Sequence, residues 1–367
     1  MADATPPEPL AASGFPPARA AFPEDVGVAI VCHNNRDQLQ LALASLEAAG
    51  CPRSRVLVVD VASTDGTVAW LRQAYPEVRL RVLDRNDGPS PGRNVGIRET
   101  REPYVFLMDA DVQVEPDTIQ RLRAALAEDA AVKIGSPVVV HAGDPARIQY
   151  AGGSLHFICE AINPWLDRPL ADRGCGRADV GVAPTCGLLL DREAALEVGL
   201  FDERYFIGKE DGDFTHRVRL AGYRILELPD AIVRHQSRPR GDWLFYYQIR
   251  NRWHFMLKNY QWRTLLAILP CLLIHEPLQL FVLHASGHGR TYWKSVRGLL
   301  AMLPALGRDR ALTARIRRVP DSALLQSAGL IVREDLARHP LVRIGKDAYE
   351  RFLTAYWRLL RRTVLAR

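Results

Sequence analysis

Short apolar runs alternate with amphipathic segments along the first third of the chain. Runs rich in branched and aromatic side chains predict buried strands at residues 28–32, 56–59, 80–83 and 104–108. The apolar spacing between these runs predicts helices over about residues 37–49 and 67–75. Strands that alternate with helices in this way predict an α/β fold built on a parallel sheet.

Polar side chains follow these apolar runs where the strands are predicted to end. Asn35 follows the first strand, Asp60 ends the second, and Asp109 and Asp111 end the fourth. Because ligands of parallel sheets bind outside the carboxyl ends of the strands, we expect these side chains to share one edge. Ionised carboxylates at the end of an apolar strand are costly to desolvate, and a divalent cation is their usual partner. The alternative is a pair of solvated carboxylates in a loop.

Common nucleotide-binding motifs do not accompany this edge. The first predicted strand-to-helix turn has no glycine fingerprint, and the glycines at 88, 92 and 96 follow the third strand with a different spacing. The chain also contains no Gly-Lys-Ser/Thr sequence. A nucleotide bound at this edge would therefore be held by a metal and by side chains.

A longer series of short motifs continues through the chain. In chain order they lie at residues 32–35, 58–67, 92–96, 108–111, 185–190, 199–206, 210–213, 221–224 and His235. In this order and spacing the series resembles the family 2 inverting glycosyltransferases, and most of all the branch with bacterial rhamnosyltransferases and related cell-surface glycan enzymes. The resemblance covers roughly residues 26–260. It implies a GT-A fold, the Rossmann-like α/β fold of nucleotide-diphospho-sugar transferases, here with a mostly helical C-terminal appendage.

Two motifs depart from the family pattern. The family usually has Asn-Gly after the second-strand aspartate, where this chain has Val61-Ala62, and it often has Thr-Tyr-Asn in place of His33-Asn34-Asn35. Both changes lie beside the expected base and ribose contacts. They therefore bear on the identity of the nucleotide and not on the class of reaction.

The resemblance implies a divalent metal, Mn²⁺ or Mg²⁺, that stabilises the charge on the leaving diphosphate. Asp111 is the expected first ligand, Asp109 is expected behind it or on the ribose, and His235 is expected to complete the site. Imidazole suits Mn²⁺ better than Mg²⁺. The alternative for His235 is a purely structural histidine.

Inversion by direct displacement needs a general base near the acceptor hydroxyl, and the resemblance selects Asp211 for this role. Crowding of Glu210, Asp211 and Asp213 is expected to raise some of their pKa values. The alternative is an acidic helix N-terminus, where carboxylates favour the helix dipole.

Four residues are expected to bind the nucleotide-sugar donor: Asn35, Asp60, Arg93 and Asp109. Asp60 is expected to accept hydrogen bonds from the base or ribose, and Arg93 to reach the diphosphate. Pairing with a carboxylate at the sheet edge is the alternative for Arg93.

Three further residues are expected on the acceptor side. Gly187 lies in a segment similar to acceptor-side loops, Glu210 precedes the expected base, and Arg250 lies in a segment similar to the Arg-Asn segment of the family. The alternative for the glycine is ordinary turn chemistry.

Positive charge is concentrated near the C-terminus. Residues 285–367 hold 17 Lys and Arg against 6 Asp and Glu, whereas the whole chain of 367 residues has a formal net charge of +6. A basic region on a mildly acidic remainder indicates an anionic partner. Because no nucleic-acid-binding motif is present, the prediction is an anionic membrane and no nucleic acid.

Two C-terminal segments favour a membrane surface. The apolar run at 265–283 is interrupted by Pro270 and by His275-Glu276-Pro277, which favours lying in the interface over crossing it. Near the end, apolar side chains recur at helical spacing beside arginines and predict a basic amphipathic helix on anionic lipid: Tyr349, Phe352, Leu353, Tyr356, Trp357 and Leu360. The alternative is packing on the catalytic domain or on a second subunit, as in a homodimer.

The predicted organisation has three parts. Residues 1–24 form a disordered Pro/Ala-rich leader, residues 25–260 the GT-A domain, and residues 261–367 a basic, helical, membrane-associating region. The N-terminal segment lacks the cationic region followed by an apolar stretch that would predict secretion. The six cysteines are scattered without metal-ligand spacing. These features predict a cytoplasmic protein, peripheral on the inner face of the cell membrane.

The predicted function is transfer of a sugar from a nucleoside-diphosphate sugar to a hydroxyl of a glycan or lipid-linked acceptor. A catalytically silent nucleotide-sugar-binding scaffold is the non-enzymatic alternative. A sugar nucleotidyltransferase is a further alternative, but this chain lacks the glycine-rich basic signature near the first strand that such an enzyme needs.

Overall fold

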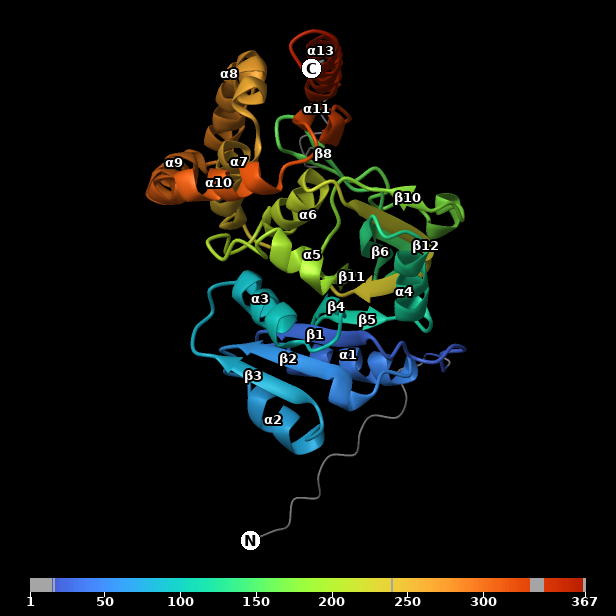
Figure 1. Ribbon diagram of the computed structural model, residues 1–367. Helices are drawn as coiled ribbons and strands as arrows, with labels where there is room; N and C mark the ends of the chain where they lie inside the picture. Colours follow the sequence, from blue (N-terminus) through green and yellow to red (C-terminus); the bar gives the residue numbers. More distant parts are fainter. Residues whose placement is uncertain (1–14, 16, 239, 331–339, 366–367) are drawn as a thin grey trace.

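A large mixed sheet forms the centre of the molecule, with helices on both of its faces (Figure 1). The computed structural model describes residues 15, 17–238, 240–330 and 340–365. The strands of this sheet are β1 (Val26–Cys32), β2 (Val56–Val61), β3 (Arg79–Leu83), β4 (Tyr104–Asp109), β5 (Val112–Val114), β6 (Val132–His141), β7 (Asp144–Tyr150), β10 (Ala178–Asp179), β11 (Gly187–Asp191) and β12 (Arg224–His235). Their order is β10-β12-β6-β11-β4-β1-β2-β3, with β5 paired to β12 and β7 to β6.

Helices cover both faces of this sheet. They are α1 (Arg36–Ala48), α2 (Thr67–Ala74), α3 (Pro89–Glu99), α4 (Thr118–Glu128), α5 (Arg192–Glu197) and α6 (Glu210–Leu220), with short 3₁₀ turns η1 (Arg53–Arg55) and η2 (Leu170–Arg173). Side chains of α1, α2 and α4 pack with one set of strand residues, and those of α3, α5 and α6 pack with the other set. The two hydrophobic cores therefore lie on opposite faces of the sheet.

The first four predicted strands are present and parallel. β1 pairs with β2 and β4, and β2 pairs with β3, all in parallel register. Every residue of β1 and β2 is buried, because helices cover both faces, and such strands are uniformly apolar. Cys32 lies opposite Asp60, and Val31 lies opposite Asp109, so the strands end together. The predicted α/β fold with a parallel sheet is confirmed.

The glycine-rich segment after β3 forms the helix α3. Pro89 begins it, as proline suits the first helical turn. A Cβ on Gly92 would lie 2.9 Å from a Val31 methyl, and one on Gly96 would lie 2.8 Å from the Ala29 Cβ. These two glycines let α3 lie directly on β1, which is a packing role and not a phosphate-binding role.

Beyond Asp109 the sheet becomes mixed. β11 lies antiparallel between β4 and β6, and β12 is parallel to β6. The short strand β5 pairs antiparallel with the end of β12, so that Val112 lies opposite His235. This pairing brings the end of β12 beside the turn that follows β4.

The C-terminal part is mostly helical. It contains α7 (Leu244–Asn259), α8 (Trp262–Ala285), α9 (Gly289–Met302), η3 (Leu303–Ala305), α10 (Leu306–Ile316), α11 (Asp321–Leu324) and α13 (Pro340–Arg362). The strand β13 (Leu325–Gln326) joins β8 (Ser154–His156) and β9 (Ala161–Ile162) in a second sheet. Figure 1 shows these helices at the end of the molecule away from α2 and β3. The predicted helical appendage is confirmed.

The C-terminal helices share a hydrophobic core with the first part of the chain. Phe157 stacks on Trp357 of α13 with ring centroids 4.8 Å apart, and Leu353 and Leu360 are buried beside them. Most of the apolar stripe predicted for this amphipathic helix therefore packs on protein, while Phe352 is 40% exposed. For the buried part of the stripe the structure has the alternative of packing on the rest of the chain, and lipid contact by α13 stays a prediction.

The predicted leader at 1–24 lies largely outside the described residues, and the boundary at residue 260 stays a prediction.

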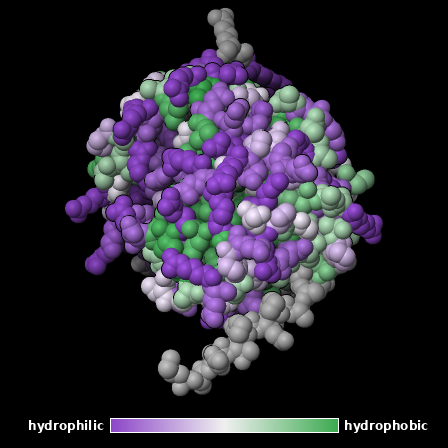
Figure 2. Space-filling view, turned by 60° about the horizontal axis from the view of Figure 1, so that its bottom comes forward, coloured by the Kyte–Doolittle hydropathy of each residue, from purple (hydrophilic) through white to green (hydrophobic). Residues whose placement is uncertain are grey.

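Figure 2 shows that hydrophilic side chains cover most of the face of the molecule that includes its lower end in Figure 1, with smaller hydrophobic groups among them. All six cysteines are free thiols, and Cys175 is the exposed one.

Candidate active site

Two buried oxygen atoms without a partner lie at the carboxyl ends of neighbouring strands. Asp60 is the last residue but one of β2, and its Oδ1 accepts a hydrogen bond from the Ser63 backbone N–H at 2.9 Å. Its Oδ2 and the Oδ1 of Asn35 are buried and have no hydrogen-bond partner among the described residues. Buried polar atoms of this kind are normally satisfied. Both atoms are therefore available to donors on a ligand at this edge.

The loops after β1 and β2 hold each other in place. His33 Nδ1 lies 2.6 Å from the Val61 carbonyl oxygen, and Asn34 Oδ1 accepts from the Thr64 N–H at 2.7 Å. Ala62 has φ +54°, a left-handed conformation that costs a residue with a Cβ about 1–2 kcal/mol. This is the position at which the family usually has glycine, so the backbone shape is kept although the residue differs.

Arg93 is the centre of a carboxylate cluster. Its side chain is 3% exposed and comes from α3. One terminal nitrogen lies 3.1 Å from both oxygens of Asp109, and the other donates to Asp211 Oδ1 at 2.8 Å. Burial acts to lower the pKa of Arg93, but the charges of Asp109 and Asp211 outweigh it and raise the pKa above its usual value. Arg93 is therefore a buried cation that joins β4 to α6.

Asp211 stands at the start of α6 with one oxygen held and one open. Thr185 donates its hydroxyl proton to the same Oδ1 that Arg93 contacts. About a third of the Asp211 side chain stays exposed, and both hydrogen bonds from described side chains to this carboxylate go to Oδ1 and not to Oδ2. The carboxylate is thus fixed in position while one oxygen remains accessible to a substrate.

Glu210 is buried beside Asp211. Burial, together with the charge of Asp211, raises the pKa of Glu210 from 4.5 to about 7, and the charges of Arg93 and Arg240 oppose the rise. Crowding of the acidic segment therefore raises one pKa, as the sequence predicts. Asp213, the third acidic residue, points elsewhere and is buried against the cations Arg217 and Lys258.

Asp111 and His235 face each other past the ends of β4 and β12. The Nε2 atom of His235 lies 3.6 Å from Asp111 Oδ1, and its Nδ1 lies 2.7 Å from Gln149 Oε1. The Gln149 amide nitrogen donates to Ser237 Oγ at 2.7 Å, which turns Oε1 toward the ring. Gln149 therefore orients the His235 ring, and Nε2 points toward the Asp111 carboxylate.

Asp109 lies between these two groups. Burial and the negative charges of Asp111 and Asp211 raise its pKa, although Arg93 opposes the rise. Because Arg93 contacts both of its oxygens, Asp109 is tied to the cluster more tightly than Asp111 is. Asp111 is the freer carboxylate for a cation.

Two of the expected acceptor-side residues, Gly187 and Arg250, make their contacts outside the carboxylate cluster around Arg93. Gly187 begins β11, where a Cβ would lie 3.4 Å from the Val233 methyls, so its small size serves close packing. Arg250 stacks on Tyr246 and Tyr247, and it donates to the Arg204 carbonyl oxygen at 2.9 Å. These contacts hold α7 to the loop before α6 and do not involve the carboxylate cluster.

An open hollow of about 660 Å³ adjoins His235. It lies where β12 ends and where β6 turns into β7. Its polar lining includes Gln113, His141, Asp144, Arg147, Asp167 and Ser237. Its lining is rich in hydrogen-bonding groups, which suits a polar ligand such as a sugar.

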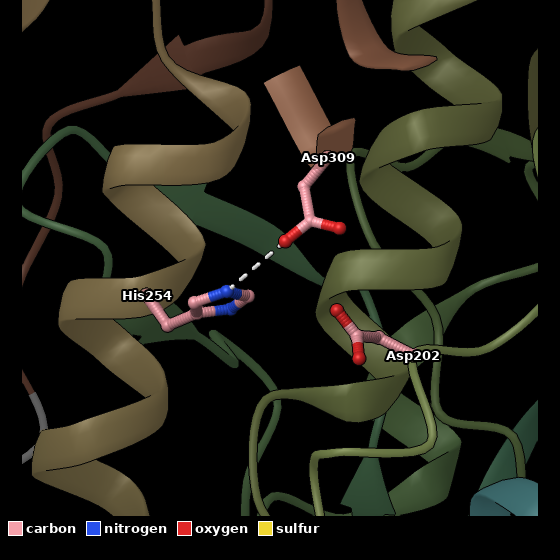
Figure 3. A group of neighbouring side chains, drawn as sticks. All are labelled: Asp202, His254 and Asp309. Atoms are coloured by element: carbon pink, nitrogen blue, oxygen red, sulfur yellow. Dashed lines mark ion pairs between the residues drawn. The ribbon is translucent and has the colours of Figure 1, made fainter. Parts of the chain in front are cut away.

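A second group of acidic and histidine side chains lies between α7, α10 and the loop before α6 (Figure 3). Asp202, His254 and Asp309 offer ligand atoms within 4.8 Å of one another. Arg204, however, donates to Asp202 at 2.6 Å and lies 2.8 Å from Asp309, and Lys258 donates to Asp202 at 2.9 Å. Two cations already neutralise these carboxylates. We interpret the group as an ion-pair network that anchors the loop.

Three contacts of the site are not evident from the sequence. Thr185 lies in a recognised motif, but nothing in that motif indicates a bond to Asp211. Gln149 lies within β7 with no local signal, and its contact with His235 depends on strand pairing. Arg240 follows β12, and its charge acts on the pKa of Glu210.

Comparisons with known proteins show the family and the fold of the chain. A family model described as Glycosyl transferase family 2 matches residues 27–187. An N-acetylglucosaminyl-diphospho-decaprenol L-rhamnosyltransferase of Mycobacterium tuberculosis (strain ATCC 25618 / H37Rv) is 30% identical over 234 residues, which cover 57% of this chain and 75% of the relative. Glycosyltransferase AglE of Haloferax volcanii is 25% identical over 224 residues, 60% of this chain and 69% of the relative.

One solved structure, of GalNAc-T7 with UDP, GalNAc and Mn²⁺, superposes with a TM-score of 0.53 at 16% identity. The superposition covers 66% of this chain, which spans about half, 49%, of the length of that structure. The fold and the acidic sheet edge define a glycosyltransferase of the GT-A class. The chain belongs to glycosyl transferase family 2.

Proposed function

We propose that this glycosyltransferase transfers a sugar from a nucleoside-diphosphate sugar to a hydroxyl of a glycan or lipid-linked glycan, with inversion at the sugar carbon. The observation that carries the proposal is the position of Asp211. Arg93 and Thr185 both hold its Oδ1, while Oδ2 is open beside the acidic edge of the sheet. A carboxylate held in this way is suited to take the proton of an attacking hydroxyl.

Direct displacement explains why the site keeps its acidic groups on two elements. The acceptor hydroxyl loses its proton to Asp211 on α6 and attacks the sugar carbon from the side opposite the diphosphate. Asp109 and Asp111 at the end of β4 lie on the leaving-group side. Arg93 separates the two sides and prevents direct repulsion between the carboxylates.

The residues at the end of β4 fit a divalent metal. The Nε2 atom of His235 and the carboxylate of Asp111 face each other at 3.6 Å, and both groups could serve as ligands of one cation. A bound Mn²⁺ or Mg²⁺ would offset the negative charge that develops on the leaving diphosphate. A mixed nitrogen and oxygen donor set favours Mn²⁺. Asp109 would stand behind these ligands.

The nucleotide is assigned to the ends of β1 and β2. The unpartnered oxygens of Asn35 and Asp60 accept hydrogen bonds from the base or ribose in this proposal. Arg93 has only its Nε free of a partner among the described residues, so its expected contact with the diphosphate is limited to that N–H. Arg240, whose charge acts on Glu210, is a second cation beside the cluster.

The acceptor is assigned to the open side of Asp211. Glu210, Gly187 and Arg250 were expected there, and of these Glu210 adjoins the proposed base directly. The relative from Mycobacterium tuberculosis is named for a lipid-linked acceptor. We assign the same class of acceptor to this chain, and hence a place in the cytoplasm at an anionic membrane surface.

The test is release of nucleoside diphosphate from a panel of UDP-, dTDP- and GDP-sugars, with Mn²⁺, with Mg²⁺ or with chelator. We expect metal-dependent release from one donor and a loss of about 100-fold or more in Asp211→Asn. Asp230→Asn is the control, because Asp230 is exposed and away from the cluster. If a donor binds with metal but is never turned over, even with lipid extract, the chain is a silent scaffold.

Metal binding is tested separately by titration with Mn²⁺, followed by its paramagnetic resonance signal. We expect Asp111→Ala to abolish tight binding, and Gln149→Leu to weaken it by about 10–100-fold through the orientation of His235. Gln73→Leu, at an exposed position on α2, is the matched control. Unchanged binding in Asp111→Ala would remove the metal site from the end of β4.

A further inference from the structure

Large apolar side chains line the outer face of α8 over most of its length. They recur at three- and four-residue spacing and are between 43% and 69% exposed: Trp262, Leu266, Leu269, Leu273, Ile274, Leu278 and Phe281. From first to last they span about 29 Å along the helix. Neither charged residue of α8, Arg263 or Glu276, belongs to this face. A continuous apolar face of this kind marks a contact surface.

Polar contacts on the inner side fix the rotation of α8 about its axis. Glu276 accepts hydrogen bonds from Arg252 and Trp253 of α7 and, at 2.9 Å, from Tyr292 of α9. The polar group that interrupts the apolar run therefore faces protein. Because these bonds hold Glu276 inward, the apolar residues cannot turn away from solvent.

Two helices packed against α8 expose positive charge. On α9, Arg290, Lys294 and Arg297 are exposed, and Trp293 between them is 63% exposed. On α13, whose Tyr356 donates to the Ala267 carbonyl oxygen of α8, the exposed cations are Arg351, Arg358, Arg361 and Arg362. The apolar face is thus flanked by basic groups and by a tryptophan, the composition that suits a lipid headgroup region.

We propose that the outer face of α8 lies in the surface of an anionic lipid bilayer, with α9 and α13 contacting the headgroups. α8 is long and apolar enough to cross a membrane by length and composition, with 17% of its most apolar stretch buried. Its inner side, however, is packed on α7, α9 and α13, so lipid cannot surround it. Only one side is available to the bilayer, and the helix lies along the surface.

A second copy of the chain fits this face less well than lipid does. In a two-fold pair the same patch meets itself, so the basic flanks of α9 and α13 would approach the basic flanks of the other copy. Like charges at the rim of an interface disfavour association. Anionic headgroups, in contrast, would neutralise both flanks.

The inference rests on the membrane location in the proposed function and assigns it to one surface. It places lipid contact on α8 and not on the apolar stripe of α13, most of which is buried. Vesicle binding can be measured without the sugar donor, and release of nucleoside diphosphate can be measured without vesicles, so the two are tested separately.

The test is co-sedimentation of the full chain with vesicles of phosphatidylcholine, with and without phosphatidylglycerol. We expect binding to the anionic vesicles, reduced by roughly tenfold or more in Leu266→Gln/Leu273→Gln/Phe281→Gln. The matched control is Leu41→Gln/Leu166→Gln/Leu196→Gln, three leucines exposed by 37–40% on other surfaces. Arg290→Gln/Lys294→Gln/Arg297→Gln is expected to weaken binding to anionic vesicles only.

Equal binding by the α8 variant and the control variant would overturn the inference, as would failure of the unaltered chain to bind anionic vesicles. A dimer seen by sedimentation velocity without lipid, and lost only in the α8 variant, would assign the face to a second copy instead. Release of nucleoside diphosphate in lipid-free solution should be the same in the α8 variant and the unaltered chain. If neither protein released nucleoside diphosphate, the proposed transfer reaction would be contradicted, but the conclusion from vesicle binding would be unaffected.

Discussion

Arg93 binds two carboxylates that belong to different parts of the sequence. Asp109 and Asp211 are 102 residues apart, yet the two ends of one guanidinium contact both. A planar guanidinium can hold two carboxylates on separate nitrogens and so fix their spacing, whereas a lysine would contact both through a single nitrogen. The residue that the sequence assigns to the diphosphate therefore has a second role, which is to set the spacing between the two acidic groups.

Thr185→Val tests the position of Asp211 at constant side-chain shape. The change removes the hydroxyl that donates to Oδ1 and leaves Arg93 as the remaining contact. A hydrogen bond to a charged group contributes about 1.5–3 kcal/mol, so we expect kcat to fall by roughly tenfold or more with little change in donor KM. Steady-state kinetics with the active donor measures both.

The control for this prediction is Thr100→Val. Thr100 is also buried, and its hydroxyl donates to the Gly96 carbonyl oxygen at the end of α3. We expect Thr100→Val to lower the free energy of unfolding about as much as Thr185→Val does, but to leave kcat unchanged. A fall in kcat of the same size in both variants would show that the effect is general and not specific to Asp211.

Glu210 makes the stability of the fold depend on pH. Its pKa is about 7 in the folded chain and 4.5 in the ordinary case, so the folded state binds the extra proton between these values. Stability is therefore greatest at the acidic end of this window and falls as pH rises through 7. Between the acidic and the basic end of this window, the contribution of Glu210 to the free energy of unfolding changes by on the order of 3 kcal/mol.

Glu210→Gln removes this dependence, because the amide does not titrate. Thermal denaturation at about pH 5 and at about pH 8 measures this. The melting temperature of the variant minus that of the unaltered chain should be larger at about pH 8 than at about pH 5. Glu128→Gln, at an exposed position, should show no such gain. A constant difference across the window would show that Glu210 is already ionised at pH 5.

Among the elements, α8 and α13 show what periodicity can and cannot predict. Helical spacing predicts the apolar face of α13, and an interrupted apolar run predicts the apolar character of α8, but neither pattern indicates what covers the apolar side chains. In α13 the stripe packs on Phe157, more than 190 residues earlier in the chain. In α8 the polar residues His275 and Glu276 face α7, α9 and α13, and the apolar residues remain exposed. Both outcomes depend on contacts between distant segments.

The Arg252–Glu276 pair should hold α8 on α7. Removing one partner leaves a buried charge, and Glu276→Leu is expected to cost about 3–5 kcal/mol in the free energy of unfolding. Arg252→Met/Glu276→Leu should cost less than the sum of the single changes, by about 2 kcal/mol. Chemical denaturation of the four proteins measures this coupling.

An exposed pair supplies the reference for this cycle. Arg177 and Glu128 also form an ion pair, but both side chains are about half exposed. Their coupling is expected below about 1 kcal/mol. If the two cycles gave the same coupling, burial would contribute nothing to the attachment of α8.

At the scale of the molecule, local pattern predicts the first half of the sheet well. β1, β2, β3 and β4, their parallel arrangement and the shared edge of Asp60 and Asp109 follow from apolar runs and the residues that end them. The site is less fully predictable. Its acidic groups are visible as motifs, whereas the contacts of Thr185 and Gln149 arise from strand pairing and helix placement, which no local pattern encodes.

The strand β13 gives the molecule one further property. By pairing with β8 it joins the C-terminal segment to the small sheet of β8 and β9, and residues of α7, α8 and α13 share the hydrophobic core beside that sheet. The same core ties α8, the helix proposed to face lipid, to α7, whose Lys258 and Asn259 bind Asp213 of α6. In the proposed orientation on a bilayer, these contacts would hold Asp211, which also lies on α6, at one height above the headgroups. We therefore expect a preference for acceptors whose hydroxyl reaches that height, so that the fold itself would select the length of its substrate.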